Sequence, residues 1–314
     1  GQLAAFSAAN ISAPADTQVA ALSATQARAL TATQLNDLQA ADIGEFTTTQ
    51  IAGMSNTQIA GMNETSIGAL TDDQVGSLTA SQLQAMLAAN VHALSETQIA
   101  AMSTTQVAAF NTTQINALDE TDIGEFSADQ IAAMTTSQIR AFDGTKLAAL
   151  DDAQVAALTN SQLAAITTTN ISAFSATQMQ ALTLLQMGAF TSQQIAAFSD
   201  ENLAALADTQ IAALSTTQAK AITATQMAAL AANDVAEFTT TQLAAMSTAQ
   251  VSALNATNVT ALADTQIAAM TTSQIARLGT EAFAALEAAQ ISTLTATQVR
   301  ALTATQMASL NASD

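Results

Sequence analysis

Residues Thr47–Met62 read TTTQIAGMSNTQIAGM, which is two successive copies of one eight-residue unit. This unit, called an octad below, runs from Ser7 to Leu310 without insertion or deletion and gives 38 copies. Its pattern is Ser/Thr–x–Thr/Ser–Gln–apolar–x–Ala–apolar, and its positions are numbered as slots 1 to 8. A fixed short period is typical of a solenoid, in which each repeat buries its apolar side chains only against neighbouring repeats.

The octad pattern predicts one short helix followed by a turn. A continuous helix would drift by about 80° per octad, so apolar slots 5 and 8 would spiral around its surface. A strand would place these two slots on opposite faces. Slot 1 is Ser, Thr, Asn, Asp or Gly in 31 of the 38 octads, and these residues cap helix N-termini. Slot 4 is usually Gln, which completes a capping box, so we expect a helix of under two turns in every octad.

The distribution of charge and side-chain size supports this direction. Acidic residues lie in slots 1 to 4 in 21 of 25 cases, and five of the six basic residues lie in slots 6 or 7, as the helix dipole favours. Slot 8 is Leu, Met, Phe or Ile in every octad except that of Pro14. Because so short a helix is unstable alone, contacts between octads must hold it. We expect slots 5 and 8 in the core, slots 2, 3 and 6 in solvent, and Ala or Gly in slot 7 where octads approach closely.

Slot 4 carries a second, longer period. Eleven octads lack Gln there, and they recur every three or four octads with a mean of 3.4. By the logic of an amphipathic helix, this spacing predicts a superhelix of about 3.4 octads per coil with these positions along one side. Two interpretations stay open: they relieve a tight corner where Gln does not fit, or they form an assembly contact line. The non-glutamine positions are Asn10, Asp42, Ser66, Asn90, Asp122, Lys146, Asn170, Asn202, Asp234, Asn258 and Ala282.

The composition of the chain argues against some classes of binding partner. The chain has 314 residues, a net charge of −19 and no Cys, which excludes disulfides and thiolate metal sites. Nucleic acid is not expected as a partner, because its binding needs a basic surface. Membrane insertion is not expected either, because slots 1 to 4 interrupt every apolar run. We predict an all-α solenoid that is a single continuous array over residues 1–314 and part of a longer array.

No motif in the chain predicts catalysis. His92 is the only histidine and lies in slot 6, where we expect it to be exposed and without a specific partner. The many Ser and Thr side chains are expected to serve as helix caps. Paired acidic residues lie in first helical turns, where the dipole already explains them. We therefore expect no enzyme, no cofactor, and no catalytic, cofactor-binding or metal-binding residue. The acidic pairs are Asp72-Asp73, Asp119-Glu120, Asp151-Asp152 and Asp200-Glu201.

Two segments carry a family resemblance. The stretch Thr47–Met62 and the stretch TATQVRALTATQMASL (Thr295–Leu310) resemble octapeptide arrays of the LTTTQIxAL type in very large bacterial proteins, secreted or surface-located. The resemblance covers essentially the whole chain. It implies export to the cell surface or the exterior, and it implies no characterised activity.

Three functions are compatible with these observations. The first is an extracellular structural protein, a fibre, filament or stalk, that self-associates end to end and also laterally. An uncapped solenoid exposes slots 5 and 8 at its ends, which favours this function. The second is a surface adhesion or binding module. The third is ice binding, because Thr-x-Thr triplets such as Thr31-Ala32-Thr33 look like ice-binding arrays, although slot 1 Thr is needed as a cap.

Overall fold

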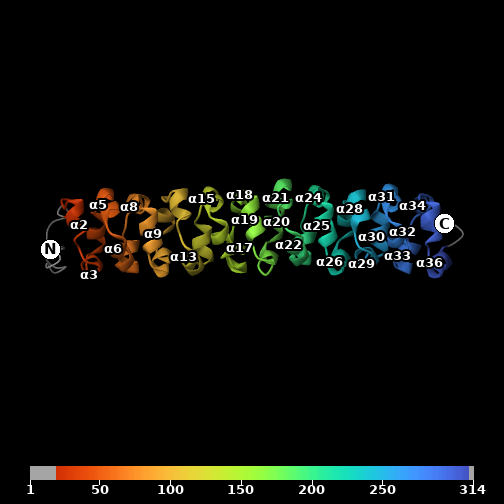
Figure 1. Cartoon of the computed structure of the whole chain (residues 1–314), viewed down its shortest axis with the longest axis horizontal. Helices are drawn as coiled ribbons and strands as arrows, with labels where there is room; N and C mark the ends of the chain where they lie inside the picture. The colour runs from red at the N-terminus through yellow and green to blue at the C-terminus, as the bar shows by residue number, and fades with distance from the viewer. Residues whose placement is uncertain (1–18, 311–314) are drawn as a thin grey trace. The chain divides into compact units, whose positions relative to one another are not determined.

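The computed structural model describes residues 19–310, and Figure 1 shows them as a succession of short helices. These residues form 35 α-helices and one 3-10 helix, with no strand among them. The chain divides into two compact units, residues 1–158 and residues 159–314. In each unit the predicted solenoid with one short helix per octad is confirmed.

Unit 1 contains α2 (Ala24–Ala27), α3 (Ala32–Asn36), α4 (Ala40–Gly44), α5 (Thr48–Gly53), α6 (Asn56–Gly61), α7 (Glu64–Gly68), α8 (Asp72–Ser77), α9 (Ala80–Ala85), α10 (Ala88–His92), α11 (Glu96–Ala100), α12 (Thr104–Val107), α13 (Thr112–Ala117), α14 (Glu120–Gly124), α15 (Ala128–Ala133), α16 (Thr136–Arg140), α17 (Gly144–Ala149) and α18 (Asp152–Ala157).

Unit 2 contains α19 (Asn160–Ala165), the 3-10 helix η2 (Ile171–Ala173), α20 (Ala176–Ala181), α21 (Leu184–Met187), α22 (Ser192–Ala197), α23 (Asp200–Ala204), α24 (Asp208–Ala213), α25 (Thr216–Ala221), α26 (Ala224–Ala229), α27 (Ala232–Ala236), α28 (Thr240–Ala245), α29 (Thr248–Ser252), α30 (Ala256–Ala261), α31 (Asp264–Ala269), α32 (Thr272–Ile275), α33 (Thr280–Ala284), α34 (Ala288–Ser292), α35 (Ala296–Arg300) and α36 (Ala304–Ser309).

Helix α9 shows how an octad begins and ends its helix. The Thr79 hydroxyl accepts a hydrogen bond of 3.3 Å from the Gln82 N–H, and Gln82 Oε1 accepts one of 2.7 Å from the Thr79 N–H. The capping box predicted from slots 1 and 4 is therefore present. Met86 leaves the helix with φ −58° and ψ 143°, so extended residues in slots 8 and 1 join one helix to the next. No residue of the described range has a positive φ, so the turn needs no glycine.

The core lies where the pattern predicts it. Slot 5 and slot 8 side chains are buried throughout the interior of each unit, as Ile51 (0 % exposed) and Met54 (4 % exposed) illustrate. Slots 2, 3 and 6 are exposed or half-buried in all described octads. The expected core did not include slot 4, whose glutamines are buried from Gln34 onward.

Packing within each unit gives the coil. Helices three octads apart contact one another, as α5 and α8 do, and α3 also contacts α7, four octads later. In Figure 1 the labels along the upper edge of unit 2 run α21, α24, α28, α31 and α34. Both observations agree with the predicted 3.4 octads per coil. Octads also approach closely at slot 7, because a Cβ added at Gly61 would lie 2.5 Å from the Ala32 Cβ.

Several non-glutamine positions three octads apart belong to helices that pack together, as their spacing predicts. Helices α4, α7 and α10 contact one another in turn, and α14 contacts α17. In unit 2, α27, α30 and α33 do the same. Two notable positions, Asn10 and Pro14, lie outside the described residues. That the whole chain forms one continuous solenoid stays a prediction.

Helices of membrane-spanning length and hydropathy do not occur among residues 19–310.

The core assignment can be tested with a matched pair of substitutions in α16 and its C-terminal turn. Phe142 is 2 % exposed, so Phe142→Ala should lower the free energy of unfolding by about 3 kcal/mol or more through lost burial and a cavity. Arg140→Ala, in exposed slot 6, should change it by less than about 0.5 kcal/mol. Urea denaturation measures both. Equal losses at the two positions would contradict the slot assignment.

Candidate functional site

The slot 4 glutamine is the most connected side chain of the octad. Gln82 is 1 % exposed, and its Oε1 is the capping acceptor described above. Its Nε2 donates to the carbonyl oxygens of Ile51 at 2.8 Å and Met54 at 3.0 Å, in the octad four positions earlier. One amide therefore caps the N-terminus of its own helix and hydrogen-bonds that helix to the preceding coil.

This arrangement recurs with constant offsets. In most octads with a slot 4 Gln, Nε2 donates to the carbonyl 31 residues earlier, the one 28 residues earlier, or both, which belong to slots 5 and 8. Sequence analysis missed this role because the capping box alone accounted for Gln. Burial of an amide is costly unless its donor and acceptor are both paired, and here both are.

The non-glutamine positions are mostly interior as well. Asp42, Asn170 and Asp234 are half-buried, and Asn10 is outside the described residues. Burial favours the first interpretation, a local packing difference, over direct surface contact, and an assembly role of these side chains stays a prediction. The buried members are Ser66, Asn90, Asp122, Lys146, Asn202, Asn258 and Ala282.

Asparagine at slot 4 keeps part of the glutamine function. Asn90 Nδ2 donates to the Met62 carbonyl at 2.7 Å, and Asn258 Nδ2 donates to the Leu230 carbonyl at 3.2 Å. Both carbonyls lie 28 residues earlier, in slot 8. The shorter side chain therefore retains the nearer of the two inter-coil bonds.

The Ser66 hydroxyl donates to the Leu35 carbonyl, 31 residues earlier, at 3.5 Å, and a residue from the preceding coil supplies the capping contact that Ser66 lacks. Asn36, in slot 6 four octads earlier, accepts the Asn63 N–H on its Oδ1 at 2.8 Å. Its Nδ2 donates to the Gly61 carbonyl at 2.8 Å. A polar slot 6 side chain thus supplies the N-cap acceptor that glutamine supplies elsewhere.

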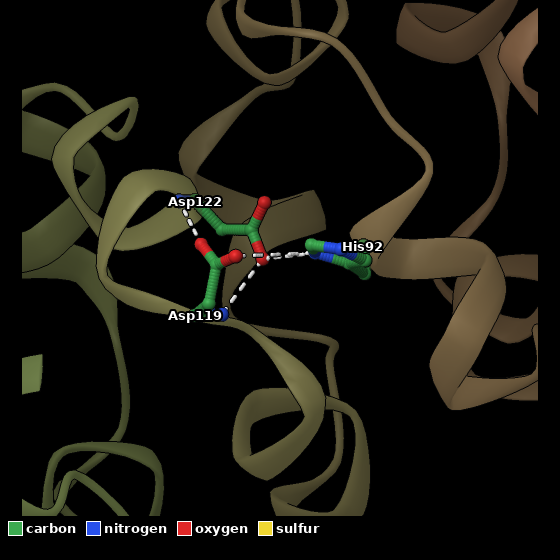
Figure 2. Close-up of side chains that lie close together, drawn as sticks. All are labelled: His92, Asp119 and Asp122. Atoms are coloured by element: carbon green, nitrogen blue, oxygen red, sulfur yellow. Dashed lines mark hydrogen bonds and ion pairs between the residues drawn. The ribbon is translucent and has the colours of Figure 1, made fainter.

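Asp122 has a corresponding partner in His92, also in slot 6 and also four octads earlier. His92 Nδ1 lies 2.6 Å from Asp122 Oδ2, which also accepts the Asp119 N–H at 2.8 Å. Asp119 Oδ2 lies 4.0 Å from the same nitrogen. Figure 2 shows the three side chains pointing toward one another, with His92 on one stretch of ribbon and both aspartates on another. His92 is exposed as predicted, but its specific partner was not foreseen.

The electrostatics of this cluster follow from these contacts. The hydrogen bond with Asp122, and then its charge, raise the pKa of His92 above its usual value. The backbone N–H of Asp122 lowers the pKa of Asp119. Burial, and then the charge of Asp122, raise the pKa of Glu125, whose Oε2 is buried without a hydrogen-bond partner. The cluster is therefore anionic around one imidazole.

Lys146 is another buried slot 4 residue, and it is paired with Asp143, the N-cap residue of its own helix. Its Nζ lies 3.1 Å from Asp143 Oδ2, although Lys146 itself is only 6 % exposed. The Lys146 backbone N–H and then the Thr145 hydroxyl lower the pKa of Asp143 to about 2. A buried ammonium here is compensated by a capping carboxylate.

A sequence signal for these partners exists at an offset of 30 residues. Among the ten non-glutamine positions with an octad four positions earlier, seven have a polar residue in slot 6 of that octad in the sequence, against five of the other 24 octads. A search of the sequence for a polar slot 6 residue 30 residues before each non-glutamine slot 4 position would have paired His92 with Asp122. The seven slot 6 residues are Ser12, Asn36, His92, Asn116, Arg140, Ser172 and Ser252.

Chemically, His92, Asp119 and Asp122 offer one nitrogen and two oxygens, all within 4.8 Å of one another, which could hold a metal ion. Sequence analysis expected no metal-binding residue, since the two aspartates were explained as first-turn acids. The expectation that the chain has no catalytic residue stays a prediction.

The contribution of the slot 4 amide to the free energy of unfolding can be measured at Gln82. Gln82→Met keeps the side-chain volume but removes the acceptor for the Thr79 N–H and the donor for two buried carbonyls. Because unpaired buried polar groups cost about 1 to 3 kcal/mol each, we expect a loss of about 2 to 4 kcal/mol in unfolding free energy. Ser81→Ala, at the exposed neighbouring position, should cost less than about 0.5 kcal/mol. A neutral Gln82→Met would refute the role of the amide.

The lowered pKa of Asp143 predicts how the stability of the chain depends on pH. Its pKa is about 2 in the folded chain against 3.8 ordinarily, so its ionised form stabilises the fold above pH 3.8 and this stabilisation is lost as pH falls through about 2. Asp143→Asn keeps a capping oxygen but lacks the charge. Chemical denaturation should show the native chain more stable than the variant at pH 5, with a difference that shrinks toward pH 2. A difference independent of pH would contradict the assignment.

Comparison with known proteins gives the family of the repeat. The model of the ALTTAQ repeat matches residues 88–120, 99–136, 123–160, 131–168 and 227–264. No curated protein matches the chain. The resemblance to octapeptide arrays is thereby confirmed for the repeat itself. The chain is an octapeptide-repeat array that is similar to the ALTTAQ repeat over residues 88–168 and 227–264.

Proposed function

We propose that the chain is a structural element that assembles head to tail into a fibre, filament or stalk outside the cell. The observation that carries this proposal is the uniform packing within each unit, where helices three octads apart contact one another and slot 5 and 8 side chains are covered by neighbouring coils. Val299 and Met307 occupy slot 5, which is fully buried in the interior, yet they are 45 % and 50 % exposed. Burying such side chains against another coil is favourable by roughly 25 cal/mol per Å² of apolar area.

The polar contacts of a coil have a direction. In most octads the slot 4 glutamine donates toward an earlier octad, so donors face the N-terminal direction and acceptor carbonyls face the C-terminal direction. A coil therefore presents donors on one face and acceptors on the opposite face, and the two faces are complementary.

The best match for the acceptor face of one coil is therefore the donor face of another coil of the same sequence, here one of a second copy. Its octads carry the same spacing of apolar and glutamine side chains that covers every interior coil. An interface that joins different ends is heterologous, and it produces open filaments when the rotation does not close. The extracellular location rests on the resemblance to arrays of secreted or surface-located bacterial proteins.

The two alternative functions have less support. For ice binding, threonines in slots 1 and 3 would have to present free hydroxyls in a regular array. Slot 1 hydroxyls are instead engaged as helix caps, and Thr239 Oγ1 also lies 3.2 Å from Thr241 Oγ1. A binding module stays an alternative, and it is separated from the filament by the experiment below.

Sedimentation velocity and negative-stain imaging of the 314-residue chain test the proposal. We expect oligomers that lengthen with concentration and appear as unbranched fibres of uniform width. Met307→Glu, at the exposed slot 5 position, should shift the chain toward monomer by placing a charge in the end contact. Ala308→Glu adds the same charge at neighbouring slot 6 and should leave assembly unchanged.

A monomer at every concentration would overturn the filament proposal and leave the binding module. Equal effects of the two glutamates would show that net charge, rather than the end face, controls association.

A further inference from the structure

The geometry points to a site for a divalent transition-metal ion of the zinc class, formed by His92 Nδ1, Asp119 Oδ2 and Asp122 Oδ2. The three atoms lie within 4.8 Å of one another and come from octads four positions apart. This inference is independent of the proposed assembly, because it concerns the middle of unit 1 and needs no second copy.

The aspartates are held in place by contacts that leave a ligand oxygen available. Asp119 Oδ1 accepts the N–H groups of Thr121 and Asp122 at 2.8 and 3.0 Å, which leaves Oδ2 to face His92. Asp122 Oδ2 is fixed by the Asp119 N–H. Backbone donors of this kind orient metal-binding carboxylates in proteins, and their loss weakens metal binding. The geometry of the ligands is thus set before an ion arrives.

The distances between the three ligand atoms are close to those of a tetrahedral zinc site. Bonds from zinc to nitrogen or oxygen measure about 2.0 to 2.2 Å, so neighbouring ligands in a tetrahedral site lie about 3.3 Å apart. His92 Nδ1 is 2.6 Å from Asp122 Oδ2 and 4.0 Å from Asp119 Oδ2. Metal binding requires the first distance to lengthen and the second to shorten, and the His92 side chain, which is 54 % exposed, has room for this movement. The metal takes the place of the proton shared by His92 and Asp122, and that proton is released to solvent.

The surroundings favour a cation and leave room for water. Glu64 acts electrostatically on His92, and Glu96 acts on neighbouring Glu125, so the local field is negative. The side chains of His92 and Asp119 are 54 % and 47 % exposed, so solvent reaches the ligand atoms. Three protein ligands with water completing the coordination suit zinc. An imidazole nitrogen favours zinc, copper, nickel or cobalt over calcium and magnesium, which prefer oxygen.

The experiment uses the fact that His92 is the only histidine of the chain. Proton NMR of the full chain should show its imidazole signals shift or broaden on addition of one equivalent of Zn²⁺. Millimolar Mg²⁺, present throughout to occupy scattered carboxylates, should leave these signals in place. Isothermal titration with Zn²⁺ should give one site per chain. Imidazole signals that do not respond to Zn²⁺ would overturn the proposal.

Two variants each remove one metal ligand and should leave the chain folded. Asp122→Gln restores the usual residue of slot 4, and Asp119→Asn keeps the capping oxygen that Asn111 uses in a neighbouring octad. Each should weaken Zn²⁺ binding by about tenfold or more. Asp200→Asn, in an acidic pair that has no histidine in its metal-binding range, is the matched control and should bind as the native chain does. Unchanged affinity in both ligand variants would show diffuse binding to acidic residues and refute the site.

Discussion

The structure depends on a buried side-chain amide that is paired at both ends. A helix of four to six residues cannot persist alone, and an apolar stripe of two residues per octad gives little directional information. The slot 4 glutamine supplies that direction. Gln82, for example, fixes the start of its own helix through Thr79 and fixes the coil through the carbonyls of Ile51 and Met54. Secondary and tertiary structure are thus determined by the same group.

Local features could be predicted because their partners lie within one octad. The capping box joins residues three apart, so Thr79 and Gln82 reveal it without knowledge of the coil. The buried slots followed from side-chain type, and the coil of 3.4 octads followed from the spacing of the non-glutamine positions. Contacts at offsets of 28 to 31 residues could not be read in this way. They require the angle and rise of each octad, which short-range spacing does not contain.

The candidate site illustrates the same limit. His92 stands in a slot that is exposed or half-buried in every described octad, and it is itself exposed as predicted. Its neighbour Asp122 was recognised only as a non-glutamine slot 4 position, and only the coil brings the two to 2.6 Å. The partner of Ser66, Asn36, was missed for the same reason. Where glutamine is absent, the interior loses an amide, and a slot 6 side chain from the preceding coil can replace the missing group.

These contacts also explain why the octad never changes length. A glutamine reaches its carbonyls across four octads, so one inserted residue anywhere between them would move the amide away from both acceptors. The insertion would also turn slots 5 and 8 out of the core. A loop between two helices of an ordinary domain tolerates insertions because few contacts depend on its length. In this chain every octad lies inside the span of several such contacts at once. The invariance of the repeat over 38 copies is therefore a requirement of its buried hydrogen bonds, and not of the apolar core alone.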